Sequence, residues 1–255
     1  MLSPQSLIRG LVQRALPSVP NTDSANNDAA IRQFSYGEIV TQPLVRKAHN
    51  LADEGSYFVA NMGVSAQNRP IGTSYSATAP WFIIQNQTVS QRLYLDYLAI
   101  TAVTATTAAS GANYTAVAIA IDPILRYSTN GTAMTLLCPN LMASNPTGIN
   151  AYGPSSSAMT ASAASGSVRL IVPQRLLRPA ASGTALSVVG DVNLLNFGGV
   201  EGAVGSITIA NANIMPQNFP PVIIGPGHSA VIYTWLNATT PAAGTDLGEI
   251  GFWVR

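Results

Sequence analysis

The chain has 255 residues, a formal net charge of +1 and only 23 charged side chains, ten of which lie within the first 54 residues. The near-zero net charge excludes a global electrostatic attraction to nucleic acid, acidic substrates or anionic membranes. Soluble monomers carry about 25% charged residues, whereas this chain fills its polar positions with Ser, Thr, Asn and Gln, which indicates that much of its surface faces other protein subunits.

The first predicted element is an amphipathic helix of about three turns near the start of the chain. Ser3 can cap this helix, Pro4 suits its first position, and Pro17 ends it. A helix of this length is not stable alone in water. We therefore expect its apolar face to dock onto a neighbouring subunit. That face comprises Leu7, Ile8, Leu11 and Val12.

Residues 1–54 are predicted to form this helix and an extended arm outside the main body, which spans residues 55–255. A polar linker over residues 21–28 follows the helix. The arm holds five basic and five acidic residues, a balance that argues against contact with a genome. No long apolar run typical of a secretory signal is present.

From about Ser56 the pattern becomes that of β-structure, with short strands separated by Gly, Pro, Asn and Ser clusters. The predicted fold class is all-β, a β-sandwich and specifically a jelly roll, with an N-terminal helix and arm. The predicted strands are Tyr57–Asn61, Trp81–Gln87, Arg92–Thr104, Tyr114–Asp122, Met134–Cys138, Val168–Val172, Leu186–Val189, Ser206–Ala210, Pro221–Ile224, Ala230–Leu236 and Glu249–Val254.

Three segments of the body carry more specific expectations. The apolar window 97–121 is broken at residues 110–113, which favours a β-hairpin over a membrane-spanning helix. Within it, residues 114–122 alternate, and their alanine face suits close packing against another layer. The Ser/Ala/Gly-rich run 143–166 is predicted to be an extended surface loop or an insertion at a subunit contact.

Residues able to perform catalysis are sparse. A Ser-His-Asp or Cys-His site assembled from His228, Asp246 and Ser229 or Cys138 is conceivable, but no spacing favours it, and Cys138 is better interpreted as a small buried hydrophobe. The residues from Gly225 onward match G-x-G-x-x-A, yet strand-like residues follow, so a tight turn is expected. We predict no catalytic, cofactor-binding or metal-binding site and no cofactor.

Two other groups of residues have alternative interpretations. Arg169, Arg175 and Arg178 could touch nucleic acid, but pairing with acidic residues of a neighbouring subunit fits them at least as well. Tryptophans 81, 235 and 253, with the nine tyrosines, could stack on sugars. Each tryptophan lies within a strand pattern, so core packing is the favoured interpretation.

The end of the chain reads as strand, turn, strand, loop, strand. The first strand and turn cover residues 220–227, and the last strand, Glu-Ile-Gly-Phe-Trp-Val-Arg, covers residues 249–255. In these closing strands, about the last 40 residues, the chain resembles structural proteins of tailed-bacteriophage virions, and the rest is similar in composition. The resemblance implies a role in capsid decoration, capsid building or the tail, without catalytic residues.

The sequence thus predicts a non-enzymatic virion protein that decorates or cements a bacteriophage capsid. Its expected partners are itself, in a homo-oligomer such as a trimer, and other virion proteins, with neither a membrane nor nucleic acid involved. Within the same class, a major coat subunit or a tail or neck component is the alternative. From another class, a carbohydrate-binding adhesin domain is the competing prediction.

Overall fold

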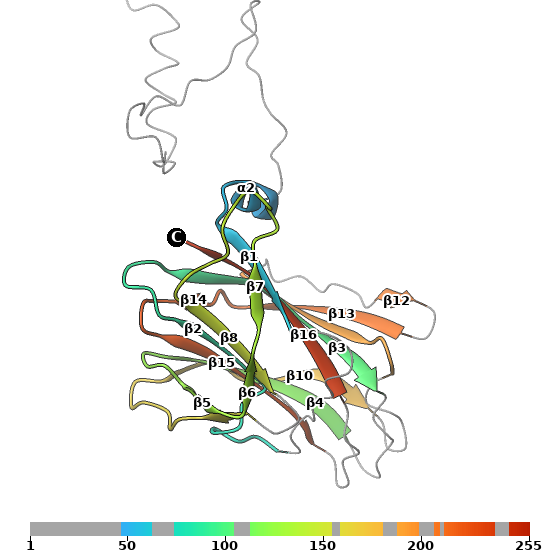
Figure 1. Cartoon of the computed structure of the whole chain (residues 1–255). Helices are drawn as coiled ribbons and strands as arrows, with labels where there is room; N and C mark the ends of the chain where they lie inside the picture. Colours follow the sequence, from blue (N-terminus) through green and yellow to red (C-terminus); the bar gives the residue numbers. More distant parts are fainter. Residues whose placement is uncertain are drawn as a thin grey trace, which may run out of the picture. The chain divides into compact units, whose positions relative to one another are not determined.

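The described part of the chain is built of β-strands that form two packed sheets (Figure 1). The computed structural model describes residues 47–62, 74–104, 113–154, 159–180, 188–198, 207–209, 212–237 and 245–255. The all-β sandwich predicted from the sequence is confirmed, whereas its assignment to a jelly roll stays a prediction.

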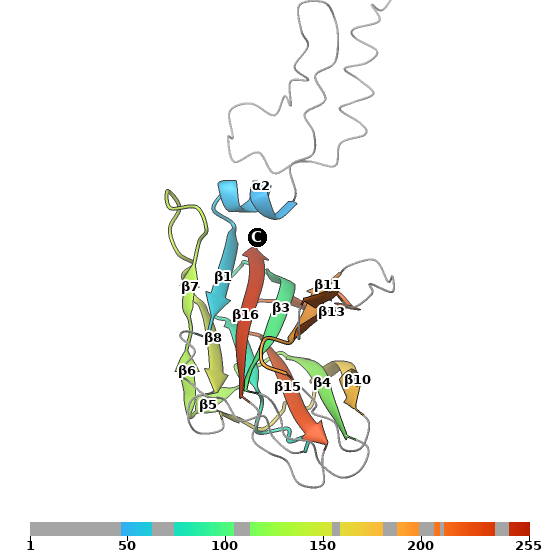
Figure 2. The same cartoon turned by 90° about the vertical axis from the view of Figure 1, so that its right-hand side faces the viewer.

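The larger sheet has eight strands in the order β12-β13-β11-β3-β16-β1-β7, and β14 also pairs with β3. The pair β11 and β13 is parallel, and the other pairs are antiparallel. Figure 2 shows β1, β16 and β3 side by side. The strands are β1 (Tyr57–Asn61), β3 (Leu93–Thr104), β7 (Thr135–Leu137), β11 (Val192–Phe197), β12 (Ile207–Ile209), β13 (Ala212–Phe219), β14 (Ile223–Ile224) and β16 (Thr245–Val254).

The second sheet has six strands in the order β10-β4-β15-β2-β8-β6. A two-stranded sheet, β5-β9, and one short helix complete the described elements. These elements are α2 (Lys47–Asp53), β2 (Phe82–Asn86), β4 (Asn113–Asp122), β5 (Tyr127–Thr129), β6 (Gly131–Ala133), β8 (Ile149–Pro154), β9 (Thr160–Ala161), β10 (Arg169–Ala180) and β15 (Ser229–Asn237).

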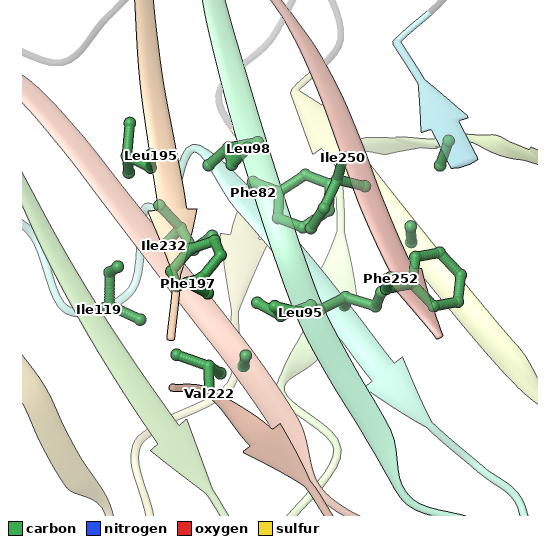
Figure 3. Packing of buried hydrophobic residues seen from close by; sticks show 14 of the residues in the cluster. Phe82, Leu95, Leu98, Ile119, Leu195, Phe197, Val222, Ile232, Ile250 and Phe252 are labelled. Atoms are coloured by element: carbon green, nitrogen blue, oxygen red, sulfur yellow. The ribbon is translucent and has the colours of Figure 1, made fainter. Parts of the chain in front are cut away.

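The main core lies between the two large sheets (Figure 3). Alternate residues of each strand point into it because successive side chains of a strand point to opposite faces. Leu98 and Ile250 enter from the eight-stranded sheet, and Phe82, Ile119 and Ile232 enter from the six-stranded sheet, all with no exposed surface. The predicted buried state of Cys138 is confirmed, since this residue belongs to the same cluster.

A second apolar layer covers the other face of the six-stranded sheet. The alanine face of β4, residues 116, 118 and 120, is buried there with Trp235 and with Ala161 of β9. Tyr75 lies over this layer, with its ring centroid 5.1 Å from that of Tyr233 and 5.6 Å from that of Trp235. The close packing predicted for the alanine face is therefore confirmed, and its partners come from the same chain.

A buried ion pair fixes the segment that follows β4. The Nη1 of Arg126 lies 2.9 Å from Oδ2 of Asp122, and both side chains are fully buried. Arg126 also donates to Ser162 O and Ala77 O, at 2.8 and 3.0 Å, and the amide of Ser165 donates to the same Asp122 oxygen. Burial opposes ionisation of Asp122, but the hydrogen bonds from Ser165 and Arg126 and the charge of Arg126 prevail and lower its pKa.

The structure overturns the predicted hairpin. The strands on either side of residues 110–113 belong to different sheets, β3 to the larger and β4 to the smaller. The apolar residues of the two strands face each other across the core, while the edges of the strands are taken by β16 and β15 from the end of the chain. The strands that pair with these edges of β3 and β4 thus lie far away in sequence.

Two further expectations are wrong. The run 143–166, predicted as a surface loop, contains β8, which pairs with β2 and β6 and buries Ile149 and Ala151. Ile149 and Ala151 of β8 are separated by one residue, so their side chains point to the same face, as in a half-buried strand. The predicted strand 186–189 is also not observed at residues 188 and 189, the part of it that the structure describes. Val189 and Gly190 form a turn there, and Gly190 has φ 89°.

Candidate functional surfaces

A cleft of about 860 Å³ opens on the eight-stranded sheet, where β3 changes its neighbour from β11 to β14. Asn196, the last residue of β11 that pairs with β3, is opposite Tyr97, whereas Ile223 of β14 is opposite Tyr94. The stretch of β3 between these two pairings forms the base of the cleft. The cleft is lined by Tyr94, Leu95, Asp96, Tyr97, Leu194, Asn196, Phe197, Gly198, Pro221, Val222, Ile223, Trp253 and Arg255.

An irregularity in β3 presents two polar side chains to this cleft. The pairing with β16 shifts between Gly251 and Phe252, which are opposite Tyr97 and Leu95, so Asp96 is an extra residue in the ladder. Such a bulge breaks the strict alternation of side chains. Leu95 and Leu98 both enter the core, and the two residues between them, Asp96 and Tyr97, line the cleft together.

Two aromatic rings lie parallel on one side of the cleft. Tyr94 and Trp253 are paired neighbours on β3 and β16, and their ring centroids lie 5.4 Å apart with an interplanar angle of 1°. Both side chains are half-buried. The core packing predicted for the tryptophans is confirmed for Trp81 and Trp235 and is wrong for Trp253, because its strand position faces away from the core.

Hydrogen bonds between tyrosines and carboxylates order this face of the sheet. The hydroxyl of Tyr57 donates to Oδ2 of Asp96 over 2.9 Å, and the hydroxyl of Tyr97 donates to Oε1 of Glu249. Burial, reinforced by the adjacent carboxylates, raises the pKa of both tyrosines well above its usual range. They therefore remain protonated donors at any physiological pH.

Gly251 makes these contacts possible. A Cβ at this position would collide with the ring of Tyr97 and the hydroxyl of Tyr57, both of which cross β16 at this point. A residue with a side chain would push the two tyrosines off the sheet. The glycine within the closing segment 249–255 is therefore required by the packing around the cleft.

A second candidate surface is the rim formed by β10, the terminal strand of the six-stranded sheet. Leu170 and Leu176 are 48% and 46% exposed, and they pair with Ala120 and Ala116 of the buried alanine face. They therefore extend the second apolar layer outward to solvent. The prolines and register shifts of β10 disfavour backbone pairing with a further strand. Another molecule would therefore contact β10 through the leucine side chains.

The three arginines for which the sequence left open contact with nucleic acid or with a neighbouring subunit lie on this same strand. Arg175 instead bonds within the chain, donating from Nη1 to Asn218 O and lying 4.7 Å from the ring centroid of Phe219. Arg175 thus connects the two sheets. Arg169 is exposed, and the side chain of Arg178 is not among those that the structure describes.

A third surface is the loop after β7. Leu141 and Met142 are 99% and 97% exposed. The loop is nevertheless held in place, because Asn140 accepts from the amide of Met142 at 3.0 Å and donates to Asp53 O at 3.1 Å. Two apolar side chains are thus presented to solvent on an ordered turn.

The remaining predicted residues are distributed as follows. The docking face of Leu7, Ile8, Leu11 and Val12 lies outside the described residues. The turn predicted from Gly225 onward is confirmed, with Gly227 at φ 73° and Nδ1 of His228 lying 2.5 Å from Pro226 O. Ser229 of β15 donates to Ile124 O, whereas Asp246 lies on β16 of the other large sheet and Cys138 lies in the main core.

Over the described ranges, no group of three or more His, Cys, Asp or Glu residues could hold a metal ion. Within the same ranges, no helix has the length and apolar character needed to cross a membrane. Comparison with protein-family models, curated proteins and solved structures finds no match.

Proposed function

We propose that this protein is a non-enzymatic structural subunit of a bacteriophage virion, which assembles with copies of itself on the capsid. The proposal rests on one observation: in a chain with few charged residues, the second apolar layer of the β-sandwich reaches the surface at Leu170 and Leu176. The exposed leucines supply apolar area that a contact can bury, and Arg169, which is exposed on the same strand, can pair with an acidic residue of the neighbouring copy. The resemblance of the closing strands to virion proteins supports the proposal that this assembly is a virion.

The β10 rim is the proposed contact between copies of the chain. Size-exclusion chromatography with light scattering should reveal an oligomer of the wild-type protein, and the double variant Leu170→Ser/Leu176→Ser should shift it to monomer. Ile124→Ser/Leu125→Ser is the matched control, because these two side chains are 37% and 41% exposed and lie outside β10. Equal loss in both variants would refute the role of the rim, and a wild-type monomer at high concentration would refute self-assembly.

The Leu141–Met142 loop is the proposed contact with other virion proteins. Leu141→Ser/Met142→Ser should leave the homo-oligomer intact and reduce incorporation of the protein into particles, as judged by electron microscopy of particles carrying it. Since few ion pairs are available, both contacts should survive about 0.5 M salt, at which charge interactions are screened within a few ångströms. Complete dissociation at that salt concentration would argue against apolar association.

A further inference from the structure

We propose that the cleft between β11, β14 and β16 is a binding site for a neutral saccharide. The inference is independent of self-assembly, since the β10 rim lies on the other sheet. The cleft volume of about 860 Å³ falls within the range of sites for small ligands, and it combines apolar walls with a few convergent polar groups, which is the composition expected of such sites.

The parallel rings of Tyr94 and Trp253 supply the apolar part of the site. A pyranose ring has one face made largely of C–H groups, which packs on flat aromatic surfaces. Tyrosine and tryptophan offer such surfaces with little loss of side-chain entropy. The entropy loss is smaller still here, because the two rings are held against each other at 5.4 Å on paired strands.

The polar part of the site consists of three side chains of different hydrogen-bonding character. Asp96 offers only acceptors and is oriented by Tyr57, Arg255 offers only donors, and Asn196 offers both; the last two also line the cleft. Sugar hydroxyls both donate and accept, so neighbouring hydroxyl groups can bond to a carboxylate and a guanidinium together.

The charges in the cleft select against other ligands. Among the side chains that line the cleft, one is acidic, Asp96, and one is basic, Arg255, so these side chains give an anionic or cationic ligand no net attraction. A wholly apolar ligand would remove both groups from water and add no hydrogen bond to the one that Asp96 accepts from Tyr57, which is unfavourable. A neutral ligand with many hydroxyl groups and an apolar face satisfies both the rings and the polar side chains.

The test begins with the full-length protein on a printed array of neutral hexose, hexosamine and uronate oligosaccharides. The strongest array ligand is then titrated by calorimetry. We expect retention of neutral saccharides. We also expect Tyr94→Ala and Asp96→Asn each to weaken binding about tenfold or more, since each removes a stacking surface or a charged acceptor.

Tyr75→Ala is the control variant. It removes an aromatic side chain that is 47% exposed over the six-stranded sheet, and it should leave the affinity within about twofold. Trp253→Phe keeps a flat ring, so it should retain binding while losing the change in tryptophan fluorescence on titration. Circular dichroism and thermal unfolding confirm that each variant is folded.

The proposal is overturned if the wild-type protein retains no neutral saccharide on the array. Equal affinities for the wild type and Asp96→Asn would place the sugar elsewhere on the protein. Retention of uronates alone would refute the charge argument. Binding of a proline-rich peptide without any saccharide would assign the aromatic rings to peptide recognition instead.

Discussion

Replacing Arg126 by methionine should destabilise the fold more than any other single change of an arginine in the described body. This side chain is fully buried and donates to three groups: Asp122, Ser162 O and Ala77 O. Its loss leaves the Asp122 carboxylate buried with only the Ser165 amide among these donors. Breaking a buried ion pair from one side typically costs about 3–5 kcal/mol of unfolding free energy.

The pair can be dissected by a double-mutant cycle. Asp122→Asn retains an acceptor for Ser165, but it leaves a buried guanidinium that cannot lose its charge, so it should cost about 3 kcal/mol. The double variant carries no buried charge and should lose about 4 kcal/mol, less than the roughly 7 kcal/mol sum of the single losses. The expected coupling energy between Arg126 and Asp122 is therefore about 3 kcal/mol.

Urea unfolding followed by tryptophan fluorescence and circular dichroism measures these free energies. Arg92→Met is the control, because Arg92 is exposed and its replacement should change stability by less than about 0.5 kcal/mol. Additivity of the two single losses within about 0.5 kcal/mol would show that the pair does not act as a unit. A loss below about 1 kcal/mol for Arg126→Met would refute the argument from burial.

Desolvation raises the pKa of Asp246 from 3.8 to about 7, so the folded protein keeps a proton that the unfolded chain releases, and stability should fall by about 4 kcal/mol as pH rises from below 3.8 to above about 7. Asp246→Asn should flatten this dependence in urea unfolding at several pH values, and an unchanged slope would contradict it. Gly251→Ala should lose about 1–3 kcal/mol through overpacking against two tyrosines, whereas Gly166→Ala, which meets nothing within 4 Å, should have little effect on thermal unfolding. Cys138, being buried, should react with a thiol reagent only in denaturant, and fast labelling of the native protein would refute its core position.

The strands that could be predicted are those whose own residues carry a clear pattern. Tyr57–Asn61 was predicted with the bounds of β1, and the long apolar runs of β3, β4 and β15 were found to within one residue at each end. Their β-branched and aromatic residues specify strand locally. Their partners could not be predicted, because pairing depends on segments distant in sequence.

The missed strands have local sequences that favour other structures. β13 contains Pro216, which argues against a central strand. It is accommodated because β12 pairs only with Ala212–Ile214, leaving β13 with β11 as its described neighbour at Pro216. β11 contains Asn193 and Asn196, which are typical of turns, and pairing with β3 overrides that preference.

The cleft was only partly visible in the sequence. Leu93 to Asp96 alternate regularly, and the succession Tyr97-Leu98 breaks the alternation, which is the local signal of the bulge. Trp253 was identified as a sugar-stacking alternative, but its neighbour Tyr94 and the acceptor Asp96 could not be assigned to the same site. They meet only because β16 lies beside β3.

The position of β16 between β1 and β3 has a consequence for biosynthesis. Tyr97 and Glu249, which bond across β3 and β16, are 152 positions apart. At synthesis rates of about 5–20 residues per second, β3 leaves the ribosome roughly 8–30 s before the strand that completes its sheet. During that interval its leucines lack their final neighbours, so nascent chains are exposed to aggregation and should benefit from chaperones that hold them until β16 has been synthesised.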